Sequence, residues 1–490
     1  MNTRKRNWLP GLVAIVILIS LPVWYFTRTA ESNVDTPWDN VPRRPAHVDH
    51  ANLFDTFGEF TSGQQVTVAC LSCHEDAGKQ MLKTAHWRWE SDPVEVAGRE
   101  GLHSTGKKKS INNFCIGIRG NWASCTACHA GYGWEDENFD FGDETRVDCL
   151  VCHDQSGAYS KGKAGLPVEG VDLLLAAQSV GVPTRQNCGG CHFRGGGGNA
   201  VKHGDLDQSL YYPTDGVDVH MGRFDFQCVD CHRTTDHVIG GRSTSVSLDN
   251  ANQIACRDCH DAKLHADDRI NAHTDTVACQ TCHIPQIAVK QATKTHWDWS
   301  TAGDDTREED THEYLKIKGS FVYQKNLMPE YRWFNGLAER YLRGDTVNAG
   351  GVTAMNAPRG DVRDPEARIW PFKIHRARQP YDTEYEYLLQ PVTSGEGGFW
   401  QEFDWDQAFR LSEQISGRAY SGNYDFAATE MYWPSTHMVA IKEKALQCQA
   451  CHSENGRLDW QALGYDGDPI TYGSQARKRA LAAHGEAGNE

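Results

Sequence analysis

The hydropathy of the chain is uneven, because one long apolar run lies near the N-terminus and the rest is polar. The run covers the 19 residues from Trp8 to Phe26 and follows the basic residues 4–6. As a helix it would be roughly 28 Å long, close to the hydrocarbon thickness of a bilayer. The basic cluster should stay in the cytoplasm, which would export the remainder of the chain. The pattern predicts a periplasmic protein anchored to the inner membrane by residues 8–26.

A cleaved signal peptide is the alternative interpretation of this segment. Cleavage after Ala30 would place Arg28 at the −3 position, where a small residue is needed. We therefore favour the uncleaved anchor. Both interpretations export the body of the chain.

Elsewhere the pattern predicts short elements separated by loops. The 164 residues between His283 and Cys448 are rich in aromatic and β-branched residues around glycine turns, which favours a β-hairpin near residues 314–323. Residues 436–447 are expected to form a short helix, and residues 459–490 to end helical or frayed. No alternation of strands and helices is evident. The glycine run 195–198 lacks the flanking strand and helix of a phosphate-binding loop.

The composition changes this picture, because the chain is poor in material for a core. Hydrophobic residues make up only 39 % of its 490 residues, and 46 are glycine. Something other than protein is expected to fill the interior. The formal charge of −16 argues against a nucleic-acid partner. It also requires a locally positive pocket for any anionic substrate.

The cysteines follow one repeated pattern. Of the 17 cysteines, 16 form C-x-x-C pairs, and each pair is followed directly by histidine. The pairs are Cys70 and Cys73, Cys125 and Cys128, Cys149 and Cys152, Cys188 and Cys191, Cys228 and Cys231, Cys256 and Cys259, Cys279 and Cys282, and Cys448 and Cys451. The histidines that follow are His74, His129, His153, His192, His232, His260, His283 and His452.

C-x-x-C-H is the attachment signature of haem c, in which two thiols bond to the porphyrin and the histidine binds the iron. A zinc site or a disulfide framework imposes no rule on the residue after the second cysteine. With only 22 histidines in the chain, eight in that position are not chance. The sequence therefore predicts eight haem c groups with these eight histidines as proximal ligands. The sequence leaves open whether the protein also binds calcium.

The remaining 14 of the 22 histidines can supply ligands for the opposite faces of the irons. We expect seven to do so: His86, His220, His237, His265, His273, His296 and His437. The others are left without a ligand role: His47, His50, His103, His203, His312, His375 and His484. Seven second ligands for eight irons leave one iron open or weakly held, and an open iron is where substrate chemistry can occur.

The fold class expected is mainly α with much irregular loop, organised around eight covalent haems, with a small β-containing insert free of haem. We divide the chain into residues 1–30 as anchor or signal, 31–283 as a seven-haem core, 284–447 as the insert, and 448–490 as the eighth haem and tail. Porphyrins packed against the chain would replace much of an ordinary core.

Three segments resemble the octahaem tetrathionate reductase family, within the hydroxylamine oxidoreductase-like multihaem cytochromes. They are FCIGIRGNWASCTACHAGYGW around the second motif, GGGGNAVKHGDLD after the fourth, and YWPSTHMVAIKEKALQCQACH at the last. The resemblance implies that the second haem is catalytic and that a lysine, here Lys202, occupies its distal face. An amine binds iron only when deprotonated, so Lys202 would need burial to lower its pKa.

Cys115, the odd cysteine, has no partner left for a disulfide if all haems attach. A small buried hydrophobe is one interpretation. The resemblance implies instead a thiol in the pocket of the catalytic haem. The cations 107–109 and Arg119 would raise its thiolate fraction and hold a sulfur oxyanion. Lys202, Cys115, Arg119 and His203 are therefore the candidate catalytic residues.

The resemblance implies an exported reductase that delivers two electrons to tetrathionate, a small anion, to give two thiosulfates. Reduction of nitrite or hydroxylamine at the same haem is an alternative, as is a non-catalytic electron conduit. The electron donor would be an unidentified protein or a quinol-linked cytochrome.

Overall fold

The computed structural model describes residues 48–55, 57–96, 100–114, 117–243, 247–261 and 263–473, together with Arg477 and Leu481. The chain divides into two compact units. One comprises residues 1–43 and Cys256–Leu264, and the other comprises residues 44–255 and 265–490. In the described part of the smaller unit, the sixth C-x-x-C-H motif begins in the 3-10 turn Cys256–Asp258. The elements below belong to the larger unit.

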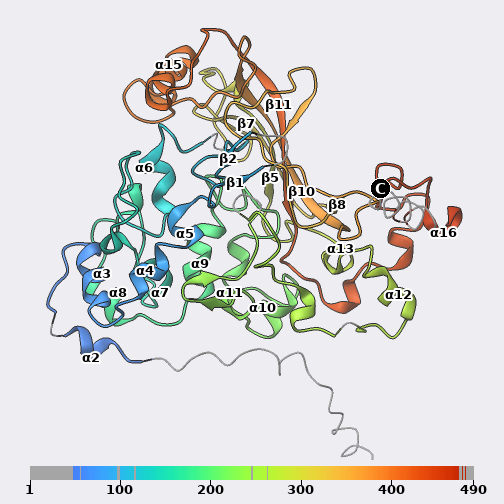
Figure 1. The fold of residues 1–490 in the computed structure, drawn as a ribbon, viewed down its shortest axis with the longest axis horizontal. Coiled ribbons are helices and arrows are strands. Elements are labelled where there is room, and N and C mark those ends of the chain that lie inside the picture. Colours follow the sequence, from blue (N-terminus) through green and yellow to red (C-terminus); the bar gives the residue numbers. More distant parts are fainter. Residues whose placement is uncertain are drawn as a thin grey trace, which may run out of the picture. The chain divides into compact units, whose positions relative to one another are not determined.

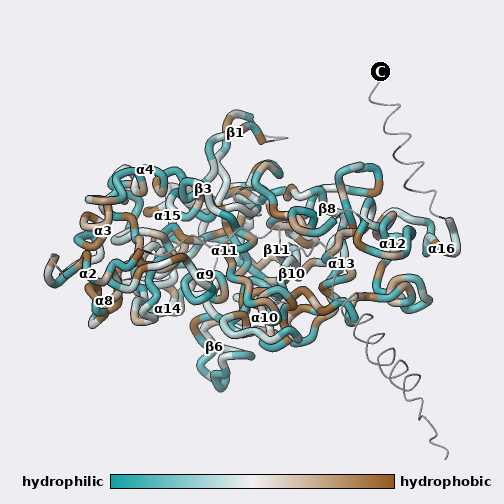
Figure 2. The backbone as a smooth tube through the Cα atoms, turned by 90° about the horizontal axis from the view of Figure 1, so that it is seen from below, coloured by the Kyte–Doolittle hydropathy of each residue, from teal (hydrophilic) through white to brown (hydrophobic). Residues whose placement is uncertain are grey.

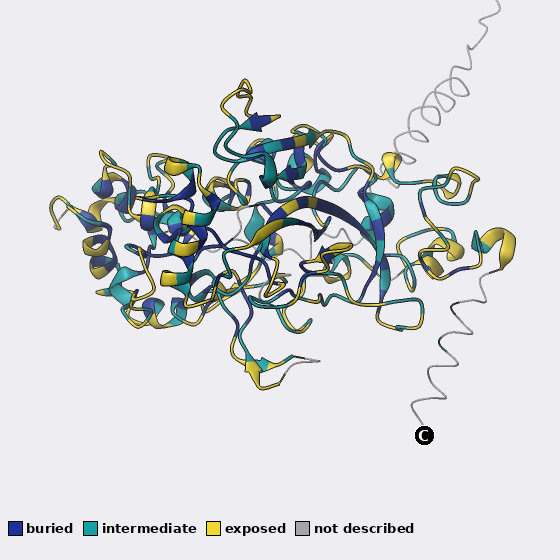
Figure 3. Ribbon diagram, turned by 90° about the horizontal axis from the view of Figure 1, so that it is seen from above, coloured by how far each residue is buried: buried dark blue, intermediate teal, exposed yellow. Residues whose placement is uncertain are grey.

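The helices of the larger unit are short, and most of those described precede residue 284 (Figure 1). They are α2 (Ala51–Phe54), α3 (Gly63–Leu71), α4 (Ala77–Met81), α5 (Ala85–Arg88), α6 (Trp122–Cys125), α7 (Leu150–His153), α8 (Leu173–Gln178), α9 (Arg185–His192), α10 (Val219–Arg223), α11 (Cys228–Cys231), α12 (Asp268–His273) and α13 (Cys279–His283). Individual helical segments carry buried and exposed residues side by side (Figure 3). Later in the chain follow α14 (Phe399–Glu402), α15 (Trp405–Ser416) and α16 (Pro469–Tyr472).

The attachment motifs lie on single helical turns. The amide of the histidine donates to the carbonyl of the first cysteine at 2.9 Å in the first and eighth motifs and 2.8 Å in the fifth. This i to i+4 bond brings both cysteines and the histidine onto one turn. The second motif differs, because the His129 amide bonds to the carbonyl of Thr126 at 2.8 Å and the backbone becomes extended at His129.

A seven-stranded sheet forms the haem-free region after α13, and two small hairpins lie before it. The strands of the sheet are β5 (Thr293–Asp298), β6 (Tyr314–Leu315), β7 (Gly319–Gln324), β8 (Glu330–Phe334), β9 (Val352–Ala354), β10 (Arg368–Asp382) and β11 (Tyr424–Pro434). Their order is β6-β7-β5-β10-β11-β9, with β8 also paired to β10. The hairpins are β1 (Val94–Glu95) with β2 (Leu102–His103), and β3 (Thr234–Thr235) with β4 (Val238–Ile239).

Strand β10 is the centre of this sheet. It pairs antiparallel with β11 over its length from Phe372 to Asp382, and antiparallel with β8 at its start. It also pairs in parallel with β5, where Ala377 faces Trp297. Aromatic residues such as Trp297, Phe399 and Trp433 form the adjoining core.

The fold class is confirmed: short helices, much irregular chain and a β-containing insert. The hairpin expected near residues 314–323 is present, since Tyr314 of β6 faces Ser320 of β7. The insert holds a larger sheet than one hairpin. Hydrophobic residues are scattered in short stretches along the coloured tube of Figure 2.

The helix expected over residues 436–447 is wrong, because only the 3-10 turn Lys442–Lys444 forms there. The amides that would start the helix bond elsewhere. The Asp205 carboxylate accepts from the amides of Thr436 at 2.7 Å and His437 at 2.9 Å, and Asp218 accepts from Val439 at 3.0 Å. These tertiary partners replace helical carbonyls and keep the segment extended.

Within the described part of the chain, no helix has both the length and the apolar character needed to cross a bilayer. Residues 8–26, on which the anchor prediction rests, lie outside the described residues.

Candidate functional site

Imidazole rings from distant segments face each other in pairs. The ring centres of His50 and His74 are 6.3 Å apart, and those of His86 and His192 are 6.0 Å apart. The other pairs are His232 with His437 at 6.2 Å, His265 with His283 at 6.2 Å, and His273 with His452 at 6.3 Å. Each pair joins the histidine of one attachment motif to a histidine outside the motifs.

These separations fit one iron between two imidazoles. Two metal–nitrogen bonds of about 2 Å, plus about 1.1 Å from each nitrogen to its ring centre, give ring centres roughly 6 Å apart. Direct contact between stacked rings would be shorter. The five pairs therefore have room for a metal of a porphyrin, and their chemistry suits haem.

Hydrogen bonds at Nδ1 orient many of these rings. The Nδ1 atoms of His153 and His232 lie 2.9 Å and 2.8 Å from the carbonyls of Gly181 and Gly240. A carbonyl accepts only from Nδ1–H, so Nε2 carries the lone pair that a metal needs. Further Nδ1 contacts are His50 to Val48 at 2.8 Å, His273 to Arg269 at 2.6 Å, His237 to Gln80 at 2.9 Å, His452 to Asp468 at 2.6 Å and His437 to Asp205 at 3.3 Å.

The seven histidines predicted as second ligands have different surroundings. His86, His265, His273 and His437 face motif histidines as above. Burial lowers the pKa of His153, and the nearby charge of His237 adds to this effect. His237 has a left-handed backbone with φ of 63°, a strained conformation that surrounding structure must hold. The His220 ring lies 6.0 Å from that of Phe226. For His296, no ring contact with a motif histidine is found among the described residues.

His50 lies opposite His74, although sequence reasoning gave it no role. Its sequence setting, HVDHANL, does not distinguish it from other histidines. The N-terminal helix α2 begins directly after it, and α2 packs against α8. Only this tertiary packing brings the ring to the first motif.

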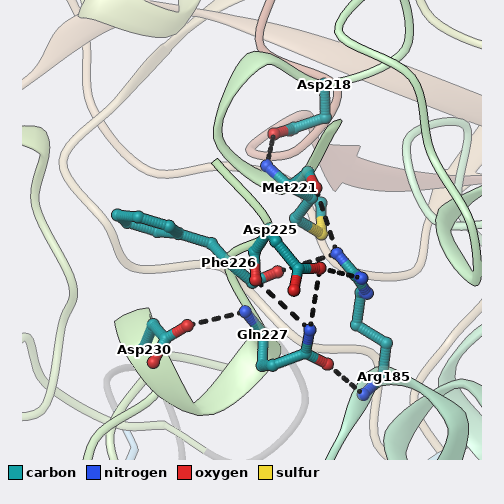
Figure 4. Close-up of polar contacts among 7 residues, drawn as sticks. All are labelled: Arg185, Asp218, Met221, Asp225, Phe226, Gln227 and Asp230. Carbon is teal, nitrogen blue, oxygen red and sulfur yellow. Dashed lines mark hydrogen bonds and ion pairs between the residues drawn. The ribbon is translucent and has the colours of Figure 1, made fainter. Parts of the chain in front are cut away.

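Arg185, at the start of α9, ties the fourth and fifth motifs together (Figure 4). Its guanidinium donates to the carbonyls of Met221 at 3.1 Å and Phe226 at 3.0 Å, and pairs with Asp225 at 2.6 Å. The Gln227 side chain accepts from the Arg185 amide at 3.0 Å, directly before α11. Asn187 of α9 donates to the carbonyl of Asp154, which follows the third motif, at 2.7 Å. These bonds fix the relative positions of three attachment turns.

The surroundings of the second motif differ from those of the others. The His129 ring lies in a box of aromatic side chains: Trp87, Trp89, Trp134, Phe139 and Phe141. Burial lowers the pKa of His129 to about 3. Its Nε2 lies 2.6 Å from the carbonyl of Trp87, and its Nδ1 has no hydrogen-bond partner in the described residues. No second imidazole is found against this ring in the part of the chain that the structure describes.

Lys202 is a half-buried residue near this motif. Burial, with the charge of Lys107, lowers the pKa of its amine to about 8, against the opposing effect of Cys128 in the second motif. The Nζ atom lies 4.6 Å from the centre of the Trp433 ring. Within the described residues Lys202 makes no side-chain hydrogen bond or ion pair. The lowered pKa makes the neutral form of the amine, which alone can bind a metal, more accessible than in an ordinary lysine.

Glycines bring the chain close to Lys202. A Cβ atom on Gly195 would lie 3.1 Å from the Lys202 side chain, and one on Gly196 would lie 2.9 Å from Phe114. Gly196 and Gly197 also have φ of 84° and 96°, which side chains rarely adopt. The glycine run therefore allows the close approach of this loop to the segment around Phe114.

One strand holds both segments in place. The buried amine of Lys373 on β10 donates to the carbonyls of Val201 at 2.7 Å and Lys202 at 3.1 Å. Two residues along, His375 Nδ1 lies 2.9 Å from the side-chain oxygen of Asn113, whose amide group donates to the His375 carbonyl at 2.7 Å. Gln379 donates to the carbonyl of Asn112 at 2.8 Å.

The four candidate catalytic residues have different surroundings. Cys115 lies outside the described residues. The His203 ring lies 5.0 Å from that of Trp433, and burial holds its pKa well below the usual value. Arg119 donates to the carbonyl of Ser416 at 3.4 Å. The structure thus brings Lys202 and His203 to one ring, Trp433.

Two of the three lysines that precede Cys115 share one carboxylate partner. Lys108 and Lys109 both pair with Glu90, at 3.0 Å and 3.8 Å. The Lys107 amine lies 3.9 Å above the Trp89 ring. The single Glu90 carboxylate therefore offsets one of these three lysine charges.

Comparison with known proteins places the chain in a family. Residues 294–455 match the family described as bacterial cytochrome c, and residues 215–284 match cytochrome c7 and related cytochromes c. An uncharacterized protein of Archaeoglobus fulgidus is 22 % identical over 247 residues, which is 40 % of this chain and 82 % of that protein.

A solved structure is far more similar. The octaheme cytochrome c from Shewanella oneidensis superposes with a TM-score of 0.81 at 48 % sequence identity, over 86 % of this chain and 98 % of that one. A similarity to an octaheme cytochrome agrees with the eight attachment motifs and with the imidazole pairs described above. The chain belongs to the octahaem cytochromes c, among the multihaem cytochromes that resemble octahaem tetrathionate reductase.

Proposed function

We propose that the protein reduces tetrathionate to thiosulfate at the haem of the second motif, with Lys202 as its distal ligand. The main support is the contrast between Lys202 and the imidazole pairs. Among the described residues, five motif histidines face the ring of a second imidazole, whereas the second motif has an amine of lowered pKa in its vicinity. An amine is more easily displaced from iron than a packed imidazole, which leaves room for a substrate.

All eight motifs carry haem c in this proposal, and the bound haems supply single electrons. Tetrathionate takes up two electrons, its central sulfur–sulfur bond breaks, and two thiosulfate anions leave. The residues of this chain have two tasks. The aromatic box around His129 excludes water, and β10 holds the Lys202 loop at a fixed distance from the second motif.

The protein would act in the periplasm, held at the inner membrane by residues 8–26. Its electrons would come from an unidentified donor protein or a quinol-linked cytochrome. The net charge of −16 favours a donor with a basic docking surface.

The substrate is tested with the reduced holoprotein. Samples are mixed in turn with tetrathionate, nitrite and hydroxylamine, and haem reoxidation is followed by absorbance. We expect tetrathionate to reoxidise the haems fastest, with two thiosulfates formed per tetrathionate. Reoxidation by nitrite or hydroxylamine alone would assign the site to nitrogen compounds. If none of the three compounds reoxidises the haems, the protein is an electron conduit and the proposed function is wrong.

The ligand is tested with Lys202→Met. In electron paramagnetic resonance and near-infrared circular dichroism of the oxidised protein, we expect one amine-ligated iron in the wild type and its loss in the variant. Tetrathionate turnover should fall at least about tenfold, the size of one lost charged interaction. Lys79→Met removes an exposed lysine that pairs with Asp76 at 3.7 Å and should change neither spectrum nor rate. An unchanged spectrum in Lys202→Met would exclude the amine as ligand.

A further inference from the structure

A small pocket, partly open to solvent, lies beside the chain that leads into the second motif. Its lining includes Ile111, Gln390 and residues of α15. Next to Gln390, the carbonyl of Pro391 accepts from the Asn121 side chain at 3.1 Å, and the Thr393 amide donates to the same side chain at 2.8 Å. Asn121 directly precedes α6 and hence the second motif. The bonds of Asn121 therefore connect the lining of the pocket to the start of the second motif.

Three guanidinium groups gather at this pocket. Arg343 and Arg418 line it, and Arg418 donates to the carbonyl of Arg343 at 3.2 Å. Arg119 lies next to them, because it donates to the carbonyl of Ser416, a lining residue, at 3.4 Å and its charge acts on Arg343. Gly344 leaves the space for Arg418, since a Cβ atom there would collide with its guanidinium.

These charges lack the partners that other arginines have. Arg410 on α15 pairs with Asp406 at 2.7 Å, and Arg363 pairs with Asp361 at 2.6 Å. Within the described residues, Arg119, Arg343 and Arg418 form no ion pair, and Nη1 of Arg343 is buried without a hydrogen-bond partner. Burial and the charges of Arg119 and Arg418 lower the pKa of Arg343 to about 10.

One carboxylate, Glu413, also lines the pocket, and it accepts from the Tyr420 amide at 3.2 Å. Three guanidiniums and one carboxylate leave a net charge of about +2. In a chain of charge −16, such a concentration of positive charge is a strong local attraction for a dianion. Guanidinium groups bind oxyanions through two parallel hydrogen bonds.

We propose that Arg119, Arg343 and Arg418 form an oxyanion-binding pocket that receives the doubly charged sulfur substrate beside the second motif. The identity of the substrate rests on the proposed function, whereas the pocket itself rests on the guanidinium cluster. The arginines hold the sulfonate ends of the anion and raise its local concentration. They are positioning and specificity residues and take no part in electron transfer.

The kinetic test uses the holoprotein with Arg343→Met and Arg418→Met as single variants. We expect KM for tetrathionate to rise about tenfold in each, with kcat changed less than twofold, because one charge-assisted contact is lost. Arg343→Lys keeps the charge but loses the paired hydrogen bonds, so it should recover part of the affinity. Arg363→Met removes an arginine that does not line the pocket and should leave KM unchanged. Haem absorbance confirms that every variant retains its cofactors.

The binding test is independent of turnover. Crystals of the holoprotein are soaked in selenate, whose anomalous scattering locates the anion. Selenate between the three arginines supports the pocket, and its loss in Arg343→Met strengthens that result. A haem propionate against these guanidiniums, or unchanged KM in both methionine variants, would overturn the proposal. If the wild type reduces no tetrathionate, the proposed function fails, and selenate binding then decides the pocket alone.

Discussion

Lys373 is a buried cation whose partners are all neutral. Its amine donates to the carbonyls of Val201 and Lys202 and to the Thr293 hydroxyl at 2.5 Å. Burial holds its pKa well below the usual value, partly against the charge of Asp205. The side chain therefore fixes the backbone that carries the proposed ligand of the second haem.

Replacing this residue tests its role in positioning. Lys373→Met leaves three buried acceptors without a donor, so we expect the free energy of unfolding to fall by about 2–4 kcal/mol. The resonance signal of the amine-ligated iron should broaden or shift, and the signals of the imidazole pairs should stay. Urea denaturation and electron paramagnetic resonance measure the two effects. The exposed Lys290→Met is the matched control. A variant that is destabilised but has an unchanged signal would reduce Lys373 to a structural residue.

The sequence predicts covalent chemistry at single residues far better than it predicts tertiary partners. The cysteines and histidines of the motifs are identified by spacing alone, because haem attachment requires them within one helical turn. The second ligands carry no such local requirement. His50 faces His74 through the packing of α2, a contact that no local pattern encodes.

Arg185 connects elements that carry different haems. Its guanidinium donates to the carbonyls of Met221 in α10 and Phe226 in the connection to α11, while its own helix, α9, holds the fourth motif. It is only 7 % exposed, so water cannot replace these bonds. The distance between the fourth and fifth haems should therefore depend on this side chain.

We expect Arg185→Met to lower the free energy of unfolding by about 2–4 kcal/mol, because two carbonyls and the Asp225 carboxylate lose their partner. Electron exchange between the fourth and fifth haems should slow as their separation becomes less defined. Chemical denaturation and pulse-radiolysis kinetics measure these changes. Arg223→Met breaks an exposed pair with Asp215, 2.8 Å apart, and should cost under about 1 kcal/mol. Equal losses in the two variants would contradict the role given to Arg185.

Strand β10 shows why the sheet was not predicted in full. A strand with one buried face is recognised by alternating apolar residues. Here Lys373, His375 and Gln379 are buried on the inward side, with Arg376 and Arg378 exposed between them. Because these three side chains are polar, the strand lacks the alternation of apolar and polar residues. They are buried because they form hydrogen bonds with the neighbouring loops. The hairpin of β6 and β7 was predictable since its signal is local.

At the scale of the whole molecule, the polar composition makes folding depend on the cofactor. Buried hydrophobic residues of the described chain divide into separate clusters, the largest of them beside the sheet. The facing imidazoles are spaced for an iron between them. Cofactor binding energy should therefore be part of the folding energy, as for other proteins with attached groups.

We expect a chain produced without haem attachment to lack a cooperative unfolding transition. The body without residues 1–30 would be expressed with and without the cytochrome c maturation system. Thermal unfolding by circular dichroism and limited proteolysis are then compared. The attached form should unfold cooperatively and resist protease, whereas the unattached form should be digested rapidly. A cooperative transition in the unattached chain would show that the protein core alone is sufficient.

The hydrogen bonds at the imidazole Nδ1 atoms have an evolutionary consequence. For His50, His153, His232 and His273 the acceptor is a main-chain carbonyl. Every residue type has the same carbonyl oxygen, so the orientation of these rings is retained when the neighbouring side chains change. Distant homologues can then exchange most of their surface and still keep the same spacing between redox centres.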